Sequence, residues 1–156
     1  VLFMSVQAGV LTGGSGSGGA PPDASSPGNL VLTPGPVMTE TGTQGVGASY
    51  TITYTNDGDK SLILTHPMGQ PEIVVTPTGH PGNISRDFGT STNLGADSTG
   101  HRFKLEKDQW MSVTLTINPD ASAAAAGQVT LHYPVQVDKG AYGISTQEFD
   151  LTIQLS

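Results

Sequence analysis

Short runs of alternating apolar and polar residues, separated by turn-forming residues, recur from residue 48 to the C-terminus. In residues 48–55, Tyr50, Ile52 and Tyr54 share one face, and a period of two predicts a strand with one buried face. The same pattern predicts strands at residues 102–106, 111–117, 127–137 and 147–155. Residues 121–126 favour a helix, but they make little more than one turn. The sequence therefore predicts an all-β fold.

The segment between residues 29 and 100 has weaker patterns. Residues 29–39 predict an edge strand, because prolines interrupt the run. Residues 56–60 carry the Asn, Asp and Gly of a tight turn, which predicts a hairpin between residues 48–55 and 61–65. A short β-branched run predicts a strand at residues 72–76. The long polar stretch 78–100 is expected to hold one short strand or to act as a functional surface loop.

The N-terminus has a strand pattern that is separated from all of these runs. Its even positions form an apolar row of Leu2, Met4, Val6, Ala8 and Val10. The following residues, 12–28, are rich in Gly, Ser and Pro and are typical of a flexible spacer. We therefore divide the chain into an N-terminal donor strand (1–11), a linker (12–28) and a β-sandwich domain (29–156).

Seven or eight short strands with turns between them indicate an antiparallel β-sandwich. Residues 102–137 resemble the immunoglobulin-like repeats of bacterial and archaeal surface proteins. The resemblance rests on an apolar-x-Leu pattern, an alternating strand, an Asn-Pro stop and a Gly-x-Val-x-Leu run. In this chain those features are Phe103 and Leu105, residues 111–117, Asn118 with Pro119, and residues 127–131. The implied fold is an immunoglobulin-like sandwich with an extended N-terminal donor strand.

The whole arrangement of strand, spacer and sandwich resembles the subunits of donor-strand filaments. These include TasA-like matrix fibres, archaeal bundling pili and archaeal threads, and more distantly the chaperone–usher pilins. The resemblance implies an extracellular, cell-surface homopolymer, in which each N-terminal strand inserts into a groove of the next copy. Two other readings of residues 1–11 stay open: the strand folds back into its own domain, or it is part of a signal peptide.

The composition argues against several classes of binding partner. Only 12% of the residues are charged, and the net charge is −7 with six Lys plus Arg, which argues against nucleic acid and anionic membranes. Eleven mostly apolar residues are too few for a membrane span, which needs about 20. The absence of Cys excludes disulfides and thiolate chemistry. A chain that begins at Val1 suggests a processed, secreted protein.

Candidate functional side chains are few. The four histidines, His66, His80, His101 and His132, lack metal-ligand spacing, so we expect neither a metal nor a cofactor. Asp57 and Asp59 fit turn chemistry better than a calcium loop. Nothing fixes a separation among Asp87, Asp97, Glu106 and Asp108, and no nucleophile motif is present, so we expect no enzyme.

Two further positions carry specific expectations. Asn83 begins the one Asn-x-Ser sequon and is a candidate glycan site in a polar loop. Trp110 is expected in the core. Two other function classes remain open beside the filament subunit: a secreted carbohydrate- or surface-binding sandwich module, and a virion decoration protein.

Overall fold

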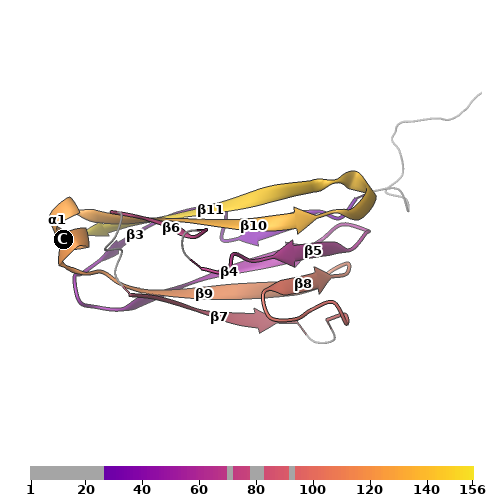
Figure 1. Ribbon diagram of the computed structural model, residues 1–156, viewed down its shortest axis with the longest axis horizontal. Coiled ribbons are helices and arrows are strands. Elements are labelled where there is room, and N and C mark those ends of the chain that lie inside the picture. Colours follow the sequence, from indigo (N-terminus) through magenta and orange to yellow (C-terminus); the bar gives the residue numbers. More distant parts are fainter. Residues whose placement is uncertain (1–26, 70–71, 78–82, 92–93) are drawn as a thin grey trace, which may run out of the picture.

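A computed structural model describes residues 27–69, 72–77, 83–91 and 94–156. Its strands run along the long axis of an elongated molecule (Figure 1). In chain order the described elements are β2 (Leu30–Thr33), β3 (Val37–Gly42), β4 (Ala48–Asn56), β5 (Leu62–Thr65), β6 (Val74–Thr76), β7 (Asn83–Thr90), β8 (Arg102–Leu105), β9 (Trp110–Asn118), α1 (Ala121–Ala126), β10 (Gln128–Asp138), a 3-10 turn at Gly140–Tyr142 and β11 (Ile144–Leu155). The predicted donor strand and most of the linker lie outside the described residues.

The strands form two sheets that pack face to face, as in an immunoglobulin-like sandwich. Sheet I has the order β3-β11-β10-β5-β8, and β6 also pairs with β10. Sheet II has the order β2-β4-β9-β7. All neighbouring strands in the described part of the chain are antiparallel except β3 and β11, which are parallel. The predicted fold class is confirmed.

The core lies between the sheets and is built by the alternation seen in the sequence. The largest fully buried side chains include Tyr54, Leu115, Tyr133 and Phe149. The inward row predicted for residues 127–137 is buried throughout, and it consists of Val129, Leu131, Tyr133, Val135 and Val137. Burying such side chains stabilises a fold by about 1.5–3 kcal/mol each. The described residues therefore bury a hydrophobic core between the two sheets.

The first predicted strand is two strands. β2 pairs with β4 in sheet II, whereas β3 pairs with β11 in sheet I, so the chain changes sheets at residues 34–36. Pro34 and Pro36 lie in this crossing, where a proline interrupts no ladder. The edge position was predicted correctly, because both strands lie at sheet edges in the described structure.

The predicted hairpin between residues 48–55 and 61–65 is wrong. β4 belongs to sheet II and pairs with β2 and β9, whereas β5 belongs to sheet I and pairs with β10 and β8. The turn at residues 57–60 is therefore a connection between sheets. The same Asn, Asp and Gly chemistry serves both kinds of turn, so the local sequence does not tell them apart.

The polar stretch at residues 78–100 contains a strand, which is one of the two alternatives that the sequence predicts. β7 spans Asn83–Thr90 and pairs with β9 over its whole length. Asn83 lies opposite Asn118 at the start of this strand, so its predicted position in a loop is wrong. The core position predicted for Trp110 is also wrong, because this side chain is 38% exposed.

Candidate functional site

The two ends of the sandwich differ, and the chain enters at one of them. We call the end with residues 27–29 and the turns at 57–60, 106–109 and 139–143 the entry end. The opposite end carries α1, the turn at 43–47 and the C-terminus, and we call it the helix end (Figure 1). Any function of the N-terminal segment therefore starts from the entry end.

Residues 27–29 are fixed to the turn that follows β4. The Asp57 N–H donates to the Asn29 carbonyl (3.0 Å), and the Asn29 side-chain amide donates to an Asp57 carboxylate oxygen (2.7 Å). Gly58 lies so close that a Cβ there would come 2.7 Å from the Pro27 carbonyl oxygen. Gly28 is equally tight against this turn, because its Cβ would lie 2.6 Å from the Lys60 carbonyl oxygen. We call residues 27–29 with this turn the anchor.

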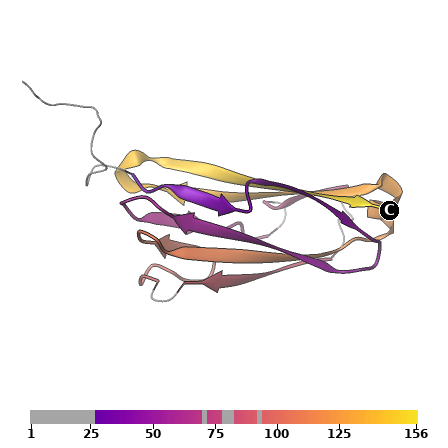
Figure 2. The same ribbon diagram turned by 180° about the vertical axis from the view of Figure 1, so that it is seen from behind.

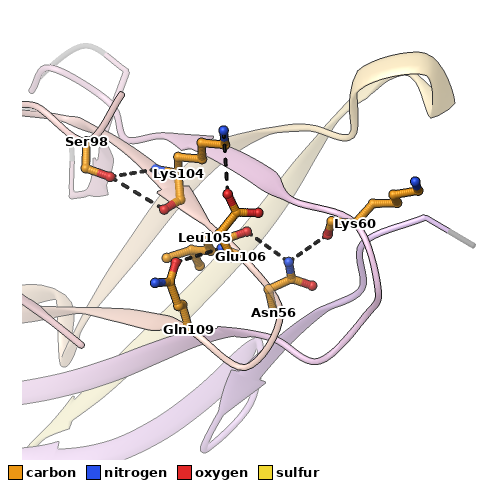
Figure 3. Close-up of polar contacts among 7 residues, drawn as sticks. All are labelled: Asn56, Lys60, Ser98, Lys104, Leu105, Glu106 and Gln109. Atoms are coloured by element: carbon orange, nitrogen blue, oxygen red, sulfur yellow. Dashed lines mark hydrogen bonds and ion pairs between the residues drawn. The ribbon is translucent and has the colours of Figure 1, made fainter. Parts of the chain in front are cut away.

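Asn56 holds the anchor to the core. Its fully buried side chain accepts hydrogen bonds from the Asn29 N–H (3.2 Å) and the Gly58 N–H (3.0 Å). Its amide group donates to the carbonyls of Lys60 (2.8 Å) and Leu105 (2.9 Å), as Figure 3 shows. One side chain thereby ties β4, the turn, the end of β8 and the entering chain together.

The next turn at the entry end is closed by its own side chains. The Glu106 N–H donates to the Gln109 side-chain oxygen (2.8 Å), and Lys104 forms an ion pair with Glu106 at 3.6 Å (Figure 3). Ser98 Oγ accepts from the Lys104 N–H (2.9 Å). The point from which the N-terminal segment leaves is therefore built from rigid, mutually bonded turns.

The change of sheet between β2 and β3 leaves part of β4 unpaired on one side. β2 covers β4 only from Thr53 to Asn56, so residues 48–52 have no strand partner on that side among the described residues. We call residues 48–52 the β4 edge. β3 lies across from it in sheet I, and its outer edge also has no described partner. Figure 2 shows this side of the molecule, with β2 stopping near the middle and β3 continuing toward the C-terminus.

A second stretch is unpaired on the same side, nearer the entry end. β3 begins to pair with β11 at Asp150, so residues 144–148 of β11 lack a described partner on that side. We call residues 144–148 the β11 edge. Ile144 within it is 64% exposed. Unpaired edges present free N–H and C=O groups that can accept another strand.

The edge strand β7 on the opposite side is protected. Arg86 lies in phase with Ile84 and Phe88, so it points inward from an edge strand. Its guanidinium donates to the Tyr133 hydroxyl (3.0 Å) and to the Met68 carbonyl (3.1 Å). An inward charge of this kind disfavours the addition of a further strand. Of the two edges of sheet II, the one on the β2 side is therefore the better candidate for strand addition.

The Arg86 contacts belong to a buried polar cluster around His66. His66 is 1% exposed, and its Nδ1 lies 2.9 Å from the Tyr133 hydroxyl. Burial, with lesser contributions from the Arg86 and His101 charges, lowers the pKa of His66 to about 3, so its ring is neutral. Burial likewise raises the pKa of Tyr133. The aromatic packing of His66 against Tyr54, Phe88 and Phe103 indicates a structural role for it.

His132 has the opposite environment, on the outer face of sheet I. It hydrogen-bonds Asp150 through Nδ1 and lies 2.6 Å from Glu148 through Nε2. The hydrogen bond to Asp150, and then the charges of Glu148 and Asp150, raise the pKa of His132. Within the described residues, no group of three His, Cys, Asp or Glu side chains is arranged to hold a metal ion.

The remaining candidates from the sequence are not brought together into one site. His80 and the row of Leu2, Met4, Val6, Ala8 and Val10 lie outside the described residues. Asp57 serves the anchor, as turn chemistry predicts. Asp59 forms an ion pair with Lys107 at 3.2 Å. Asp87 lies on β7, Asp97 lies in the turn before β8, and Glu106 and Asp108 lie in the turn between β8 and β9. No helix in the described ranges is long and apolar enough to cross a bilayer.

Two open pockets of about 340 Å³ each lie along β5 and β10. One is lined by Lys60, Asp138 and Tyr142 at the entry end, and the other by Glu72, Pro134 and Gln136. Both are lined by a mixture of charged, polar and apolar residues. Neither of these two pockets is a continuous apolar groove, so the strand edges are the better acceptor candidates among the described residues.

Sequence reasoning missed Asn56 and Arg86. Asn56 was assigned to turn chemistry alone, although its side chain is fully buried. Arg86 interrupts the apolar positions of a strand, and this hid β7 within the polar stretch. A basic residue spaced two from Ile84 and two from Phe88 is the signal that could have identified a protected edge strand.

Comparison with known proteins finds likeness at the level of the fold. No protein-family model matches the sequence, and no curated protein matches it. Among solved structures, the chain is similar to the PapD-like domain 7 of human CEP192 (16% identity, TM-score 0.48, covering 96% of this chain and 97% of that one). It is also similar to the periplasmic chaperone SfaE (10% identity, TM-score 0.49, covering 82% of this chain and 57% of that one). A third similar structure is AggA, the major subunit of aggregative adherence fimbriae type I from Escherichia coli (16% identity, TM-score 0.43, covering 84% of this chain and 95% of that one). The β-sandwich assignment rests on the sheet order and strand pairing described above.

Proposed function

We propose that this protein is a structural subunit of an extracellular filament, a pilus or thread on the cell surface. The subunits join head to tail when the N-terminal strand of one copy adds to the sandwich of the next. The row of Leu2, Met4, Val6, Ala8 and Val10 supplies the apolar face of the donated strand. The partner is another copy of the chain, and we propose no catalytic role and no cofactor.

One observation carries the proposal. The described residues bury a core between the two sheets, and the chain enters this domain through a hydrogen-bonded anchor on the same molecule as strand edges that have no described partner. These edges support the proposal that the apolar strand predicted for residues 1–11 adds to the sandwich of another copy. If four of its apolar side chains bury fully, the gross gain is roughly 6–12 kcal/mol before ordering costs. Such a gain supports a persistent joint.

The proposed joint is of the kind from which open polymers are built. The donor segment starts at the entry end, and it would meet a different surface of the next copy. Heterologous contacts of this kind generate rings or open fibres, depending on whether the rotation closes. Asn83, the candidate glycan site, begins β7 opposite Asn118, at the helix end and away from the β2–β3 side.

The test compares the intact chain with a variant that lacks residues 1–11, by negative-stain microscopy and size exclusion. We expect fibres that disappear on deletion and that a free peptide of residues 1–11 caps. A chain that stays monomeric with and without these residues would refute the filament. That outcome would favour a surface-binding module attached through the Gly/Ser spacer.

A further inference from the structure

The two unpaired edges on the β2–β3 side differ in the chemistry of their inward side chains. Behind the β4 edge, the inward positions are Ala48, Tyr50 and Ile52, and Met38 of β3 packs against the core across from them. Tyr50 is 9% exposed and Ile52 is fully buried. An apolar strand face that adds here continues the apolar row of β4, although Glu40 of β3 also lies in phase with Met38.

The inward positions of the β11 edge are polar instead of apolar. Its inward positions, in phase with the buried Phe149, are Ser145 and Gln147. A strand with an apolar row on one face would place that row against these polar groups. Desolvating polar side chains without hydrogen-bond partners is unfavourable. The β11 edge therefore suits the donor strand less well than the β4 edge does.

Position along the molecule also favours the β4 edge for a neighbour. Ala48 lies at the helix end, next to the turn at 43–47, whereas the anchor lies at the entry end. When the entry end of one copy meets the helix end of the next, the arm arrives beside Ala48. The spacer between the arm and the anchor, residues 12–26, has a root-mean-square span of roughly 20 Å, which bridges such a contact.

The direction of the strand follows from where its C-terminal half is tethered. An arm from the neighbour arrives at Ala48, so its residues near Leu11 lie beside Ala48 and it runs antiparallel to β4. An arm from the same chain arrives by the direct route from the anchor, beside Ile52, and then runs parallel to β4. Antiparallel pairs are commoner and slightly more stable. β2 itself pairs with β4 in the antiparallel sense, so the neighbour's arm extends the line of β2.

We propose that the β4 edge is the acceptor for the arm of the adjacent copy, whose residues 6–10 pair with it in the antiparallel sense and face β3 across the layer. The assignment rests on the proposed function, since it names the seat of the donated strand. It makes the change of sheet at residues 34–36 the feature that opens the acceptor.

Disulfide cross-linking tests both the seat and the direction, because the chain has no Cys of its own. One copy carries Gly9→Cys or Phe3→Cys, at outward positions of the arm. The other, marked by a size tag, carries Ser49→Cys, which is exposed at the start of the β4 edge. Cα atoms of paired strands lie about 4.5–5.5 Å apart, within the range of a disulfide. We expect Gly9→Cys to link to Ser49→Cys at least several-fold more than Phe3→Cys does.

Thr146→Cys on the exposed β11 edge is the matched control, and we expect little linking there. If fibres form and their arms link between copies to Thr146→Cys, the filament is supported but the assignment of the β4 edge as the acceptor is wrong. Preferential linking of Phe3→Cys to Ser49→Cys would overturn the direction. A further variant carries both cysteines on one chain. If its disulfides form only within that chain and no fibres appear, the proposal of a filament is wrong.

Discussion

Two buried tyrosines illustrate how hydrogen bonding determines whether a buried hydroxyl stabilises or destabilises the fold. The Tyr54 hydroxyl is buried and has no hydrogen-bond partner in the described part of the chain. The Tyr133 hydroxyl is bonded to both His66 and Arg86. A buried polar group without a partner destabilises a fold, whereas a bonded one stabilises it. The two phenols therefore contribute with opposite sign.

Replacing each tyrosine by phenylalanine measures this difference. We expect Tyr54→Phe to raise the free energy of unfolding by about 1 kcal/mol. Tyr133→Phe leaves Arg86 and His66 each short of a partner, and we expect it to lower that free energy by about 2 kcal/mol. Urea unfolding of the two variants beside the parent is the measurement. Equal effects of the two substitutions would contradict the assignment of partners.

His66 links stability to acid. Its pKa is about 3 in the folded protein, against about 6.5 in an unfolded chain. Below pH 6.5 the unfolded chain therefore binds a proton that the folded chain does not, and stability falls. The expected slope is about 1.4 kcal/mol per pH unit down to roughly pH 3. Urea titrations between pH 7 and pH 4 measure it, and His66→Gln should flatten this part of the profile.

His132 makes the stability of the fold depend on pH in the opposite sense to His66, because its pKa is raised on folding. Asp150 and Glu148 raise its pKa in the folded state, so its contribution is complete below about pH 6.5. The contribution is lost as pH rises through the raised pKa. We expect Asp150→Asn to bring the pKa of the imidazole back toward 6.5 in an NMR titration. An unchanged midpoint would show that the Asp150 hydrogen bond is absent in solution.

At the scale of elements, the anchor depends on a close backbone approach at Gly58. A Cβ at this position would lie 2.7 Å from the Pro27 carbonyl oxygen and 2.8 Å from the Gly28 carbonyl carbon. Gly58→Ala therefore forces residues 27–29 away from the turn, and we expect a loss of about 1–3 kcal/mol in unfolding free energy. Hydrogen exchange at the Asp57 amide should also accelerate, because this amide donates to Asn29.

Gly47→Ala is the control for this substitution. A Cβ at Gly47 would meet nothing within 4 Å, and the residue does not need a left-handed conformation. We expect its effect on unfolding to stay within about 0.5 kcal/mol. A similar loss in both variants would indicate a general cost of replacing glycine and would remove the argument for a tight anchor.

The alternation of side chains predicts most of the strands and their buried faces, as β4, β9 and β10 demonstrate. Strand partners are less predictable, because the turn residues after Asn56 suit a hairpin and a sheet crossing equally well. β7 escaped a firm prediction because Arg86 occupies an inward position. The candidate acceptor follows from register, since only the pairing of β2 with β4 reveals where β2 stops. In the sequence, Pro34 and Pro36 mark an interruption there, but they do not reveal that the chain changes sheets.

For the whole molecule, Glu40 bears on the proposed assembly. It lies on β3 in phase with Met38, across from the β4 edge, and its charge adds to burial in raising the pKa of Tyr50. An apolar strand seated there would partly desolvate this carboxylate. Glu40→Gln removes the charge, so we expect the critical concentration for fibre formation to fall about 5-fold, equivalent to roughly 1 kcal/mol. Sedimentation of fibres at graded protein concentrations measures this change.

Asp87→Asn, on the exposed outer face of β7, makes the same change in net charge away from both the proposed seat and the entry end. We expect it to leave the critical concentration within about 2-fold of the parent, a change below roughly 0.5 kcal/mol. Equal responses of the two variants would show that general repulsion between acidic subunits, and not the seat, controls assembly.

The crossing of the first strand from sheet II to sheet I has a consequence for growth. It places the vacant edge and the point of chain entry at opposite ends of the subunit. A fibre built from such subunits is polar: one terminus displays an empty seat, and the other displays an unused arm. The two termini would then elongate at different rates and would need chemically different caps, a lone peptide at one and a seat-bearing domain without an arm at the other.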